Sequence, residues 1–201
     1  MVYSDTFSDL RRLFQISPKN EKFVPDEKLI AEFNDAYYVG DFRTVEGDVA
    51  FGLRQIVDTA FKTLSPAIND TTTAISCIDY LTAILISPAA RPPLYFHENK
   101  LRLVINQQRF EDYFDLSFNR IRQNADGNVA IILRLLNAMD VLGKANQNFA
   151  VEEERGERHE LLETQTRLLY GLAERTIEAG ADLQTVTRHH NHVKETLEGL
   201  R

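Results

Sequence analysis

The sequence lacks the features of a secreted or membrane-spanning protein. Cys77 is the only cysteine, so the chain cannot form an internal disulfide and suits a reducing compartment. Its densest apolar run, 81–86, is far shorter than the roughly 18–20 residues that a membrane span needs. Residues 1–14 have neither the apolar segment nor the small-residue cleavage site of a secretory signal. We therefore expect a soluble protein in the cytoplasm.

Excess positive charge and the signatures of common catalytic sites are also missing. The formal net charge is -7, which repels the phosphate backbone of nucleic acid and disfavours nucleic-acid binding. GxSxG, phosphate-binding-loop and HExxH signatures are all absent. His189 and His192 lie three residues apart, but no CxxC or HxxxH pattern supplies further ligands. We expect no metal and no cofactor.

What the sequence does contain is helical periodicity. A core-facing stripe predicts a first helix from Thr44, capped by the Thr44 hydroxyl, with Glu46 and Asp48 in its first turn. Ser65 precedes Pro66 and should end this helix. A second helix, predicted over 71–87, is nearly apolar all round from residue 74 onward. Such a helix is expected at the centre of the fold.

Between these helices lies a polar elbow, residues 65–73. Arg43 stands outside the first helix, where a cation needs an acidic partner, and Asp48 and Asp70 are candidates. Free backbone N–H groups at the start of the second helix could receive an anion. The alternative is structural, because Asn69 or Asp70 can simply cap that helix. The candidate polar side chains of the elbow are Ser65, Asn69, Asp70, Thr71, Thr72 and Thr73.

Two further side chains are candidates for a functional role. Asp79, on the second helix, would need a donor if it were buried, and Arg122 is the expected partner. A structural ion pair is favoured over a catalytic carboxylate. His190 lies in the narrow apolar seam of the last helix. That seam predicts antiparallel packing on the preceding helix or pairing with a second copy.

The whole pattern predicts a mainly α fold, a multi-helix bundle with a small β-hairpin near 94–105. An isolated two-stranded hairpin is marginally stable, so it is expected to lean on the helices. We divide the chain into an N-terminal helical arm and connector (1–42), a core helical domain (43–146) and a C-terminal helical hairpin (147–201). The last segment would pack on the core or on a partner subunit.

Several short motifs follow one another in an order that resembles the signature region of a bacterial family of predicted membrane proteins, domain of unknown function 2254. They are Arg43-Thr44, Phe51-Gly52, Ser65-Pro66, Asn69-Asp70 and Thr72-Thr73-Ala74, and the stretch 113–136 is similar to the family's downstream helices. The sequence departs from the family at Gly47, Thr63 and Thr71, and contains no counterpart of its membrane helices. The resemblance implies a helical cytosolic domain, at the inner face of the membrane, and no known reaction.

Two hypotheses follow. The favoured one is an interaction or sensor domain, a homo-oligomer whose elbow binds a small polar ligand or forms an interface. The alternative is an enzyme in which Asp48, Asp70 or Asp79 is a general acid or base and Arg43 binds an anionic substrate. The enzyme hypothesis requires these side chains to converge in one pocket. The sequence identifies neither the ligand nor the partner.

Overall fold

The structure, a computed structural model, describes residues 27–28, 45, 48–86, 94–97, 100–104, 109–148 and 152–200. The chain divides into two units, one made of residues 1–47 and 90–108 and the other of residues 48–89 and 109–201. In the first unit, strands β1 (Leu94–His97) and β2 (Lys100–Val104) pair antiparallel, with an irregular register between Tyr95 and Phe96. The strands lie where the sequence indicates a hairpin.

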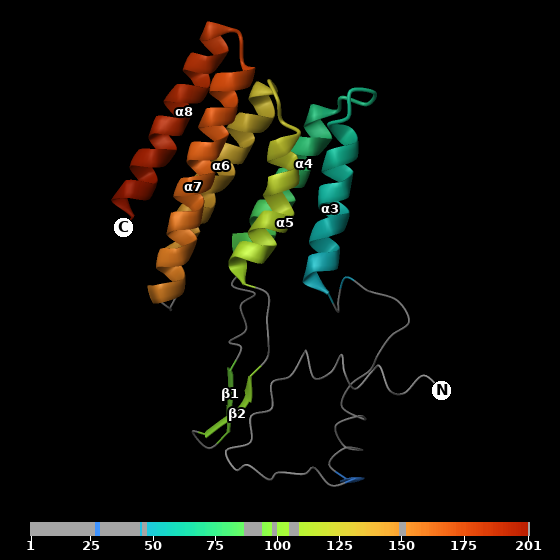
Figure 1. Cartoon of the computed structure of the whole chain (residues 1–201), viewed down its shortest axis with the longest axis vertical. Helices are drawn as coiled ribbons and strands as arrows, with labels where there is room; N and C mark the ends of the chain where they lie inside the picture. The colour runs from blue at the N-terminus through green and yellow to red at the C-terminus, as the bar shows by residue number, and fades with distance from the viewer. Residues whose placement is uncertain are drawn as a thin grey trace. The chain divides into compact units, whose positions relative to one another are not determined.

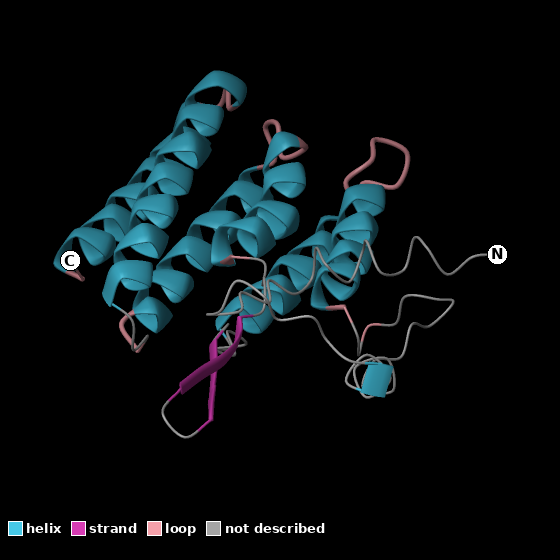
Figure 2. Ribbon diagram, turned by 60° about the horizontal axis from the view of Figure 1, so that its bottom comes forward, coloured by secondary structure: helices cyan, strands magenta, loops and turns pink. Residues whose placement is uncertain are grey.

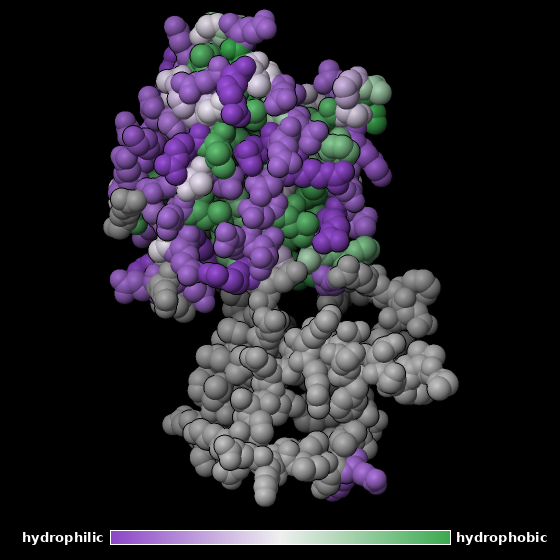
Figure 3. All heavy atoms as spheres, viewed as in Figure 1, coloured by the Kyte–Doolittle hydropathy of each residue, from purple (hydrophilic) through white to green (hydrophobic). Residues whose placement is uncertain are grey.

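The second unit is a bundle of helices that run roughly parallel or antiparallel to one another (Figures 1 and 2). Successive helices alternate in direction, and on the face shown in Figure 3 hydrophilic side chains predominate. The described part of the chain is therefore mainly helical, as the sequence predicts. Its helices are α3 (Val49–Thr63), α4 (Thr71–Ile86), α5 (Phe110–Gln123), α6 (Val129–Asn146), α7 (Glu152–Thr176) and α8 (Gly180–Gly199).

One continuous apolar core joins all six of these helices. Helix α4 packs between α3 and α6, while α7 and α8 both pack on α6. Each large side chain that is fully buried contributes about 1.5–3 kcal/mol relative to leaving it in water. The C-terminal helices thus share the core of the preceding ones. The largest fully buried side chains are Leu53, Ile78, Leu81, Phe114, Ile121, Ile131, Ile132, Leu135, Leu136, Met139, Leu162 and Leu169.

Helix α3 begins later than the sequence analysis predicts. Asp48 has an extended backbone, and its Oδ1 accepts a hydrogen bond from the Phe51 amide at 3.0 Å. Asp48 is thus the N-cap rather than a first-turn residue, and the prediction of Thr44 as the cap was wrong. A carboxylate directly before the apolar stripe caps at least as well as a threonine hydroxyl.

The prediction that α4 lies at the centre of the fold holds for part of its surface only. Ile78 and Leu81 are fully buried, but Tyr80 is 65% exposed and Ile84 is 37% exposed. Helix α4 packs between α3 and α6 and also contacts α5, and no helix of the described part covers the flank of α4 that carries Tyr80 and Ile84. Helix α4 is therefore apolar on nearly every side but is not buried on every side.

The apolar seam of the last helix packs against other helices of the same chain. Val186 and Val193 of α8 are fully buried, and Leu197 lies against Gly143 of α6. The ring of His190 stacks on that of Tyr170 in α7, with 4.3 Å between the ring centroids. The seam therefore packs within the chain, on α6 as well as on the preceding helix α7.

Candidate functional site

The elbow between α3 and α4 is an ordered turn with its own backbone hydrogen bonds. The amides of Ile68 and Asn69 donate to the Ser65 carbonyl at 3.0 and 2.9 Å, and the Asp70 amide donates to the Thr63 carbonyl at 2.8 Å. Asn69 has a φ of 48°, in the left-handed region that asparagine tolerates better than most residues. The elbow is therefore held in one conformation although most of it is exposed.

Much of the polar chemistry of the elbow is used within the turn itself. The Ser65 hydroxyl donates to the Lys62 carbonyl at 2.7 Å. The Asp70 carboxylate accepts from the Thr73 amide at 3.0 Å and from the Thr73 hydroxyl at 2.5 Å. The hydroxyl and amide bonds from Thr73 lower the pKa of Asp70. Asp70 is thus the N-cap of α4, as one alternative of the sequence analysis predicts.

The elbow is also tied to the start of α6, a connection that the sequence analysis missed. The Asn128 side-chain amide donates to the Thr71 hydroxyl at 3.3 Å, while Asn128 Oδ1 caps α6 by accepting from the Ile131 amide. Helices α4 and α6 therefore begin side by side. The cap could have been predicted, because asparagine directly before an apolar helical run is a typical N-cap. The bond to Thr71 could not, because it joins segments far apart in the sequence.

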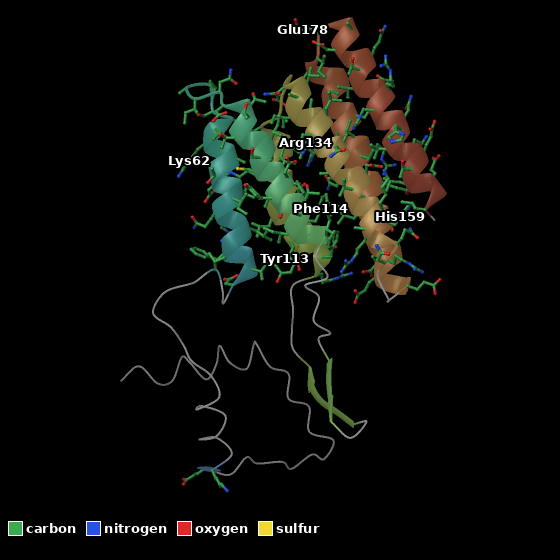
Figure 4. The ribbon with its side chains drawn as sticks, turned by 180° about the vertical axis from the view of Figure 1, so that it is seen from behind. Lys62, Tyr113, Phe114, Arg134, His159 and Glu178 are labelled. Atoms are coloured by element: carbon green, nitrogen blue, oxygen red, sulfur yellow. The ribbon has the colours of Figure 1, made fainter. Side chains whose placement is uncertain are left out.

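Asp79 has a partner, but not the expected one. Arg134 of α6 donates both Nε and Nη2 to the Asp79 carboxylate, which raises the pKa of Arg134. The prediction of Arg122 was wrong: its Nη2 lies 3.4 Å from the Asn119 side-chain oxygen. The reason is packing, since α4 contacts α6 along its length and α5 only slightly. Figure 4 labels Arg134 part-way along the bundle.

The candidate acids do not gather in one place. Asp48 caps the start of α3 and Asp70 caps the start of α4, so α3, with 15 residues and a length of about 22 Å, separates them. Asp79 lies about 12 Å further along α4 than Thr71. Arg43 lies outside the described residues. The convergence that the enzyme hypothesis requires is therefore not found among the described acids.

Neither a metal cluster nor a membrane span is found in the described part. Within it, no group of three or more His, Cys, Asp or Glu side chains could hold a metal ion. None of its helices combines the length and the hydropathy of a membrane-crossing segment.

Asp79 and Arg134 have side chains that are 42% and 39% exposed, so their pair is a surface feature of α4 and α6.

Comparisons with known proteins place the chain in a family. The model of DUF2254, described as a predicted membrane protein, matches residues 8–141. Uncharacterized protein Rv1290c of Mycobacterium tuberculosis and uncharacterized protein Mb1321c of Mycobacterium bovis are each 49% identical over 47 residues. That segment is 23% of this chain and only 9% of each relative. No solved structure matches the chain. The family match covers more than half of the sequence, and the chain belongs to the DUF2254 family of predicted membrane proteins.

Proposed function

We propose that this chain is an interaction domain of its family and that it associates with a second copy of itself through an exposed surface of α4. The observation that carries the proposal is a row of exposed residues at every fourth position, which we name the α4 flank. It begins in the elbow and runs along the helix toward its end. The flank consists of Thr72, Ser76, Tyr80 and Ile84, with Ala83 beside them.

The composition of the flank suits contact with another protein surface. Tyr80 and Ile84 present apolar surface, while Thr72, Ser76 and Ala83 are small enough for a partner helix to approach closely. Ser76 donates its hydroxyl to the Thr72 carbonyl at 3.1 Å, so part of its polarity is satisfied within the helix. An aromatic anchor beside small residues is typical of the central part of an interface.

Charge does not oppose contact between two copies at this flank. The chain has a net charge of -7, so two copies repel each other over most of their surfaces. The flank itself contains no charged residue, and the only charge of α4, on Asp79, is neutralised by Arg134. A twofold arrangement would bring two α4 flanks without charged side chains together.

The elbow joins this surface at one end. Ile68 is 59% exposed at its tip, and Thr72 is both an elbow residue and the first residue of the flank. A specific interface buries about 1,200–2,000 Å² in total, more than one helix flank supplies. Elbow residues would therefore complete the interface. The hydrogen bonds of Ser65 and Asp70 within the turn support this interface role over binding of a small polar ligand.

Analytical ultracentrifugation over a wide range of protein concentrations tests the proposal. The wild-type chain is expected to form dimers as its concentration rises, whereas Tyr80→Glu/Ile84→Glu is expected to stay monomeric because facing flanks would repel. Leu168→Glu is the matched control, since Leu168 is an apolar residue of α7 that is 42% exposed and lies outside the flank. Circular dichroism checks that the helix content is unchanged. A wild-type chain that stays monomeric at the highest concentration would refute self-association.

The family suggests the setting of this interaction. We propose that the domain acts at the cytoplasmic face of a membrane, beside the membrane helices of a family relative. In a bacterial cell, fractionation with and without such a relative would test this. Recovery of the chain with the membrane fraction only when the relative is present is the expected result, and recovery in the cytosol in both cases would contradict it.

A further inference from the structure

The row of the α4 flank is ordered by the size of its side chains. Thr72 and Ser76, nearest the elbow, have short side chains, while Tyr80 and Ile84, further along the helix, have long ones. All four are exposed, and Tyr80, at 65%, is the most exposed of the large apolar side chains that the structure describes. The surface is therefore low in the first half of the row and raised in the second half.

Two copies of such a row fit together in one orientation only. Parallel pairing of α4 with the α4 of a second copy about a twofold axis sets each residue against itself, so Tyr80 meets Tyr80 and the two Ser76 side chains face a gap. Antiparallel pairing centred at the level of Ile78 sets Tyr80 against Ser76 instead. It also sets Ile84 against Thr72, because both pairs are centred on that level. Every long side chain then packs on a short one, as close packing requires.

The level of Ile78 is accessible and uncharged on the outer side of α4. Ile78 is fully buried, and at 3.6 residues per turn the midpoint between Ser76 and Tyr80 lies on the opposite side of the helix. The nearest charge of α4 is Asp79, and the guanidinium of Arg134 neutralises it. A twofold axis at this level would therefore cross surface that neither a described helix nor an unpaired charge occupies.

The hydroxyl groups of the short half are already bonded within their own copy. The Ser76 hydroxyl donates to the Thr72 carbonyl at 3.1 Å. The Thr73 hydroxyl, which lies opposite Ala83 of the second copy in the same pairing, donates to the Asp70 carboxylate at 2.5 Å. Covering these groups therefore leaves neither hydrogen without an acceptor, and an unpaired hydrogen is the main cost of burying a hydroxyl group.

We propose that the second copy binds antiparallel, with the twofold axis at the level of Ile78 and each Tyr80 packed on Ser76 of the other copy. The inference rests on the proposed self-association and adds its orientation and register. The elbow of each copy then lies toward the far end of the other α4, which brings Ile68 toward Ile86. These side chains are 59% and 37% exposed, so their contact adds apolar area at both ends of the interface.

The distance between spin labels on the two elbows tests the orientation. Ala67 is an exposed elbow residue outside the row, so Ala67→Cys carries the label and leaves the flank intact. Cys77 is 6% exposed, and burial raises its pKa, so the native thiol is expected to stay unlabelled, which the mass of the treated wild-type chain checks. The starts of the two α4 helices would lie about 20 Å apart in the antiparallel dimer and about 10 Å apart in a parallel one. Pulsed electron paramagnetic resonance is therefore expected to give a label distance above about 20 Å, and a dimer with a shorter distance would overturn the antiparallel orientation.

Paired charges test the register. In Ser76→Glu/Tyr80→Lys, antiparallel pairing sets each new carboxylate against a new ammonium group of the other copy, whereas parallel pairing sets like charges together. Ser76→Lys/Tyr80→Lys is the matched control, because it sets like charges together in either orientation. Sedimentation is expected to show dimerisation of the first variant that is tighter by about tenfold or more, and equal affinities would overturn the register. A wild-type chain that stays monomeric would instead refute the proposed self-association itself.

Discussion

Replacement of Gly143 by alanine tests how closely α6 and α8 pack. A Cβ atom at Gly143 would lie 2.4 Å from Leu197 Cδ2 and 3.7 Å from Leu197 Cγ. Leu197 is 1% exposed, so its side chain cannot move away into solvent. Overpacking of this kind costs about 1–3 kcal/mol. The gain in helix propensity on replacing glycine by alanine returns about 1 kcal/mol. We therefore expect Gly143→Ala to destabilise the chain by about 1 kcal/mol.

Gly171→Ala is the matched control. Gly171 lies within α7, and a Cβ atom there would meet nothing within 4 Å. The same gain in propensity should then appear alone, as a stabilisation of about 0.5–1 kcal/mol. Urea denaturation followed by circular dichroism measures both variants. The two identical substitutions are expected to change the free energy of unfolding in opposite directions.

A third variant separates the steric clash from other causes. Leu197→Ala removes the atoms that the new Cβ would meet, at a cost of about 2–5 kcal/mol for the lost buried side chain. In that background Gly143→Ala should become stabilising, so that the double-mutant cycle gives a coupling energy of about 1–3 kcal/mol. If Gly143→Ala instead stabilises the otherwise wild-type chain as much as Gly171→Ala does, α8 does not lie this close to α6.

Three further predictions concern interactions between side chains. The Asp79–Arg134 pair is about 40% exposed, so a double-mutant cycle with alanine should give a coupling of no more than about 1 kcal/mol, weaker at high salt. Burial lowers the pKa of His190, so folding favours its neutral form; this stability should be complete above pH of about 6.5 and decline as the pH falls below it. His190→Gln should remove that part of the pH dependence in urea titrations from pH 8 to 5, and an unchanged profile would contradict the assignment. Asn128→Ala should lose about 1 kcal/mol with the cap of α6, and Asn128→Asp, which keeps a cap acceptor, should lose less in the same assay.

Local chemistry made the helices and their ends predictable. The Ser65-Pro66 stop, the Asp70 cap and the span of α4 all follow from residues within a few positions of each other. The start of α3 was misplaced because Thr44 and Asp48 are both acceptable caps by local rules. The spacing of the apolar residues does not show which of the two is the cap, because that depends on where the backbone leaves the helical conformation.

Contacts between distant segments were harder to predict. The sequence shows that Asp79 needs a donor, but the identity of that donor depends on whether α4 packs on α5 or on α6. Arg122 and Arg134 are equally acceptable partners by composition, and only the tertiary packing selects Arg134. The exposure of Tyr80 has the same origin, since periodicity cannot distinguish a helix that is enclosed from one that leaves a flank uncovered.

Hydrogen bonding and burial distinguish the polar residues of the elbow, which stabilise the fold, from the exposed residues of the α4 flank, which are free to contact a partner. Ser65 and Asp70 end one helix and begin the next, and Thr71 is tied to the start of α6, so their polarity has a structural cause. Tyr80 and Ile84 have no such cause, because burying them would stabilise the chain and the described helices leave them exposed. An apolar row that the described fold leaves uncovered is what contact with another molecule would bury. The surface that we propose for a partner is therefore the α4 flank, which begins beside the polar turn, and not the turn itself.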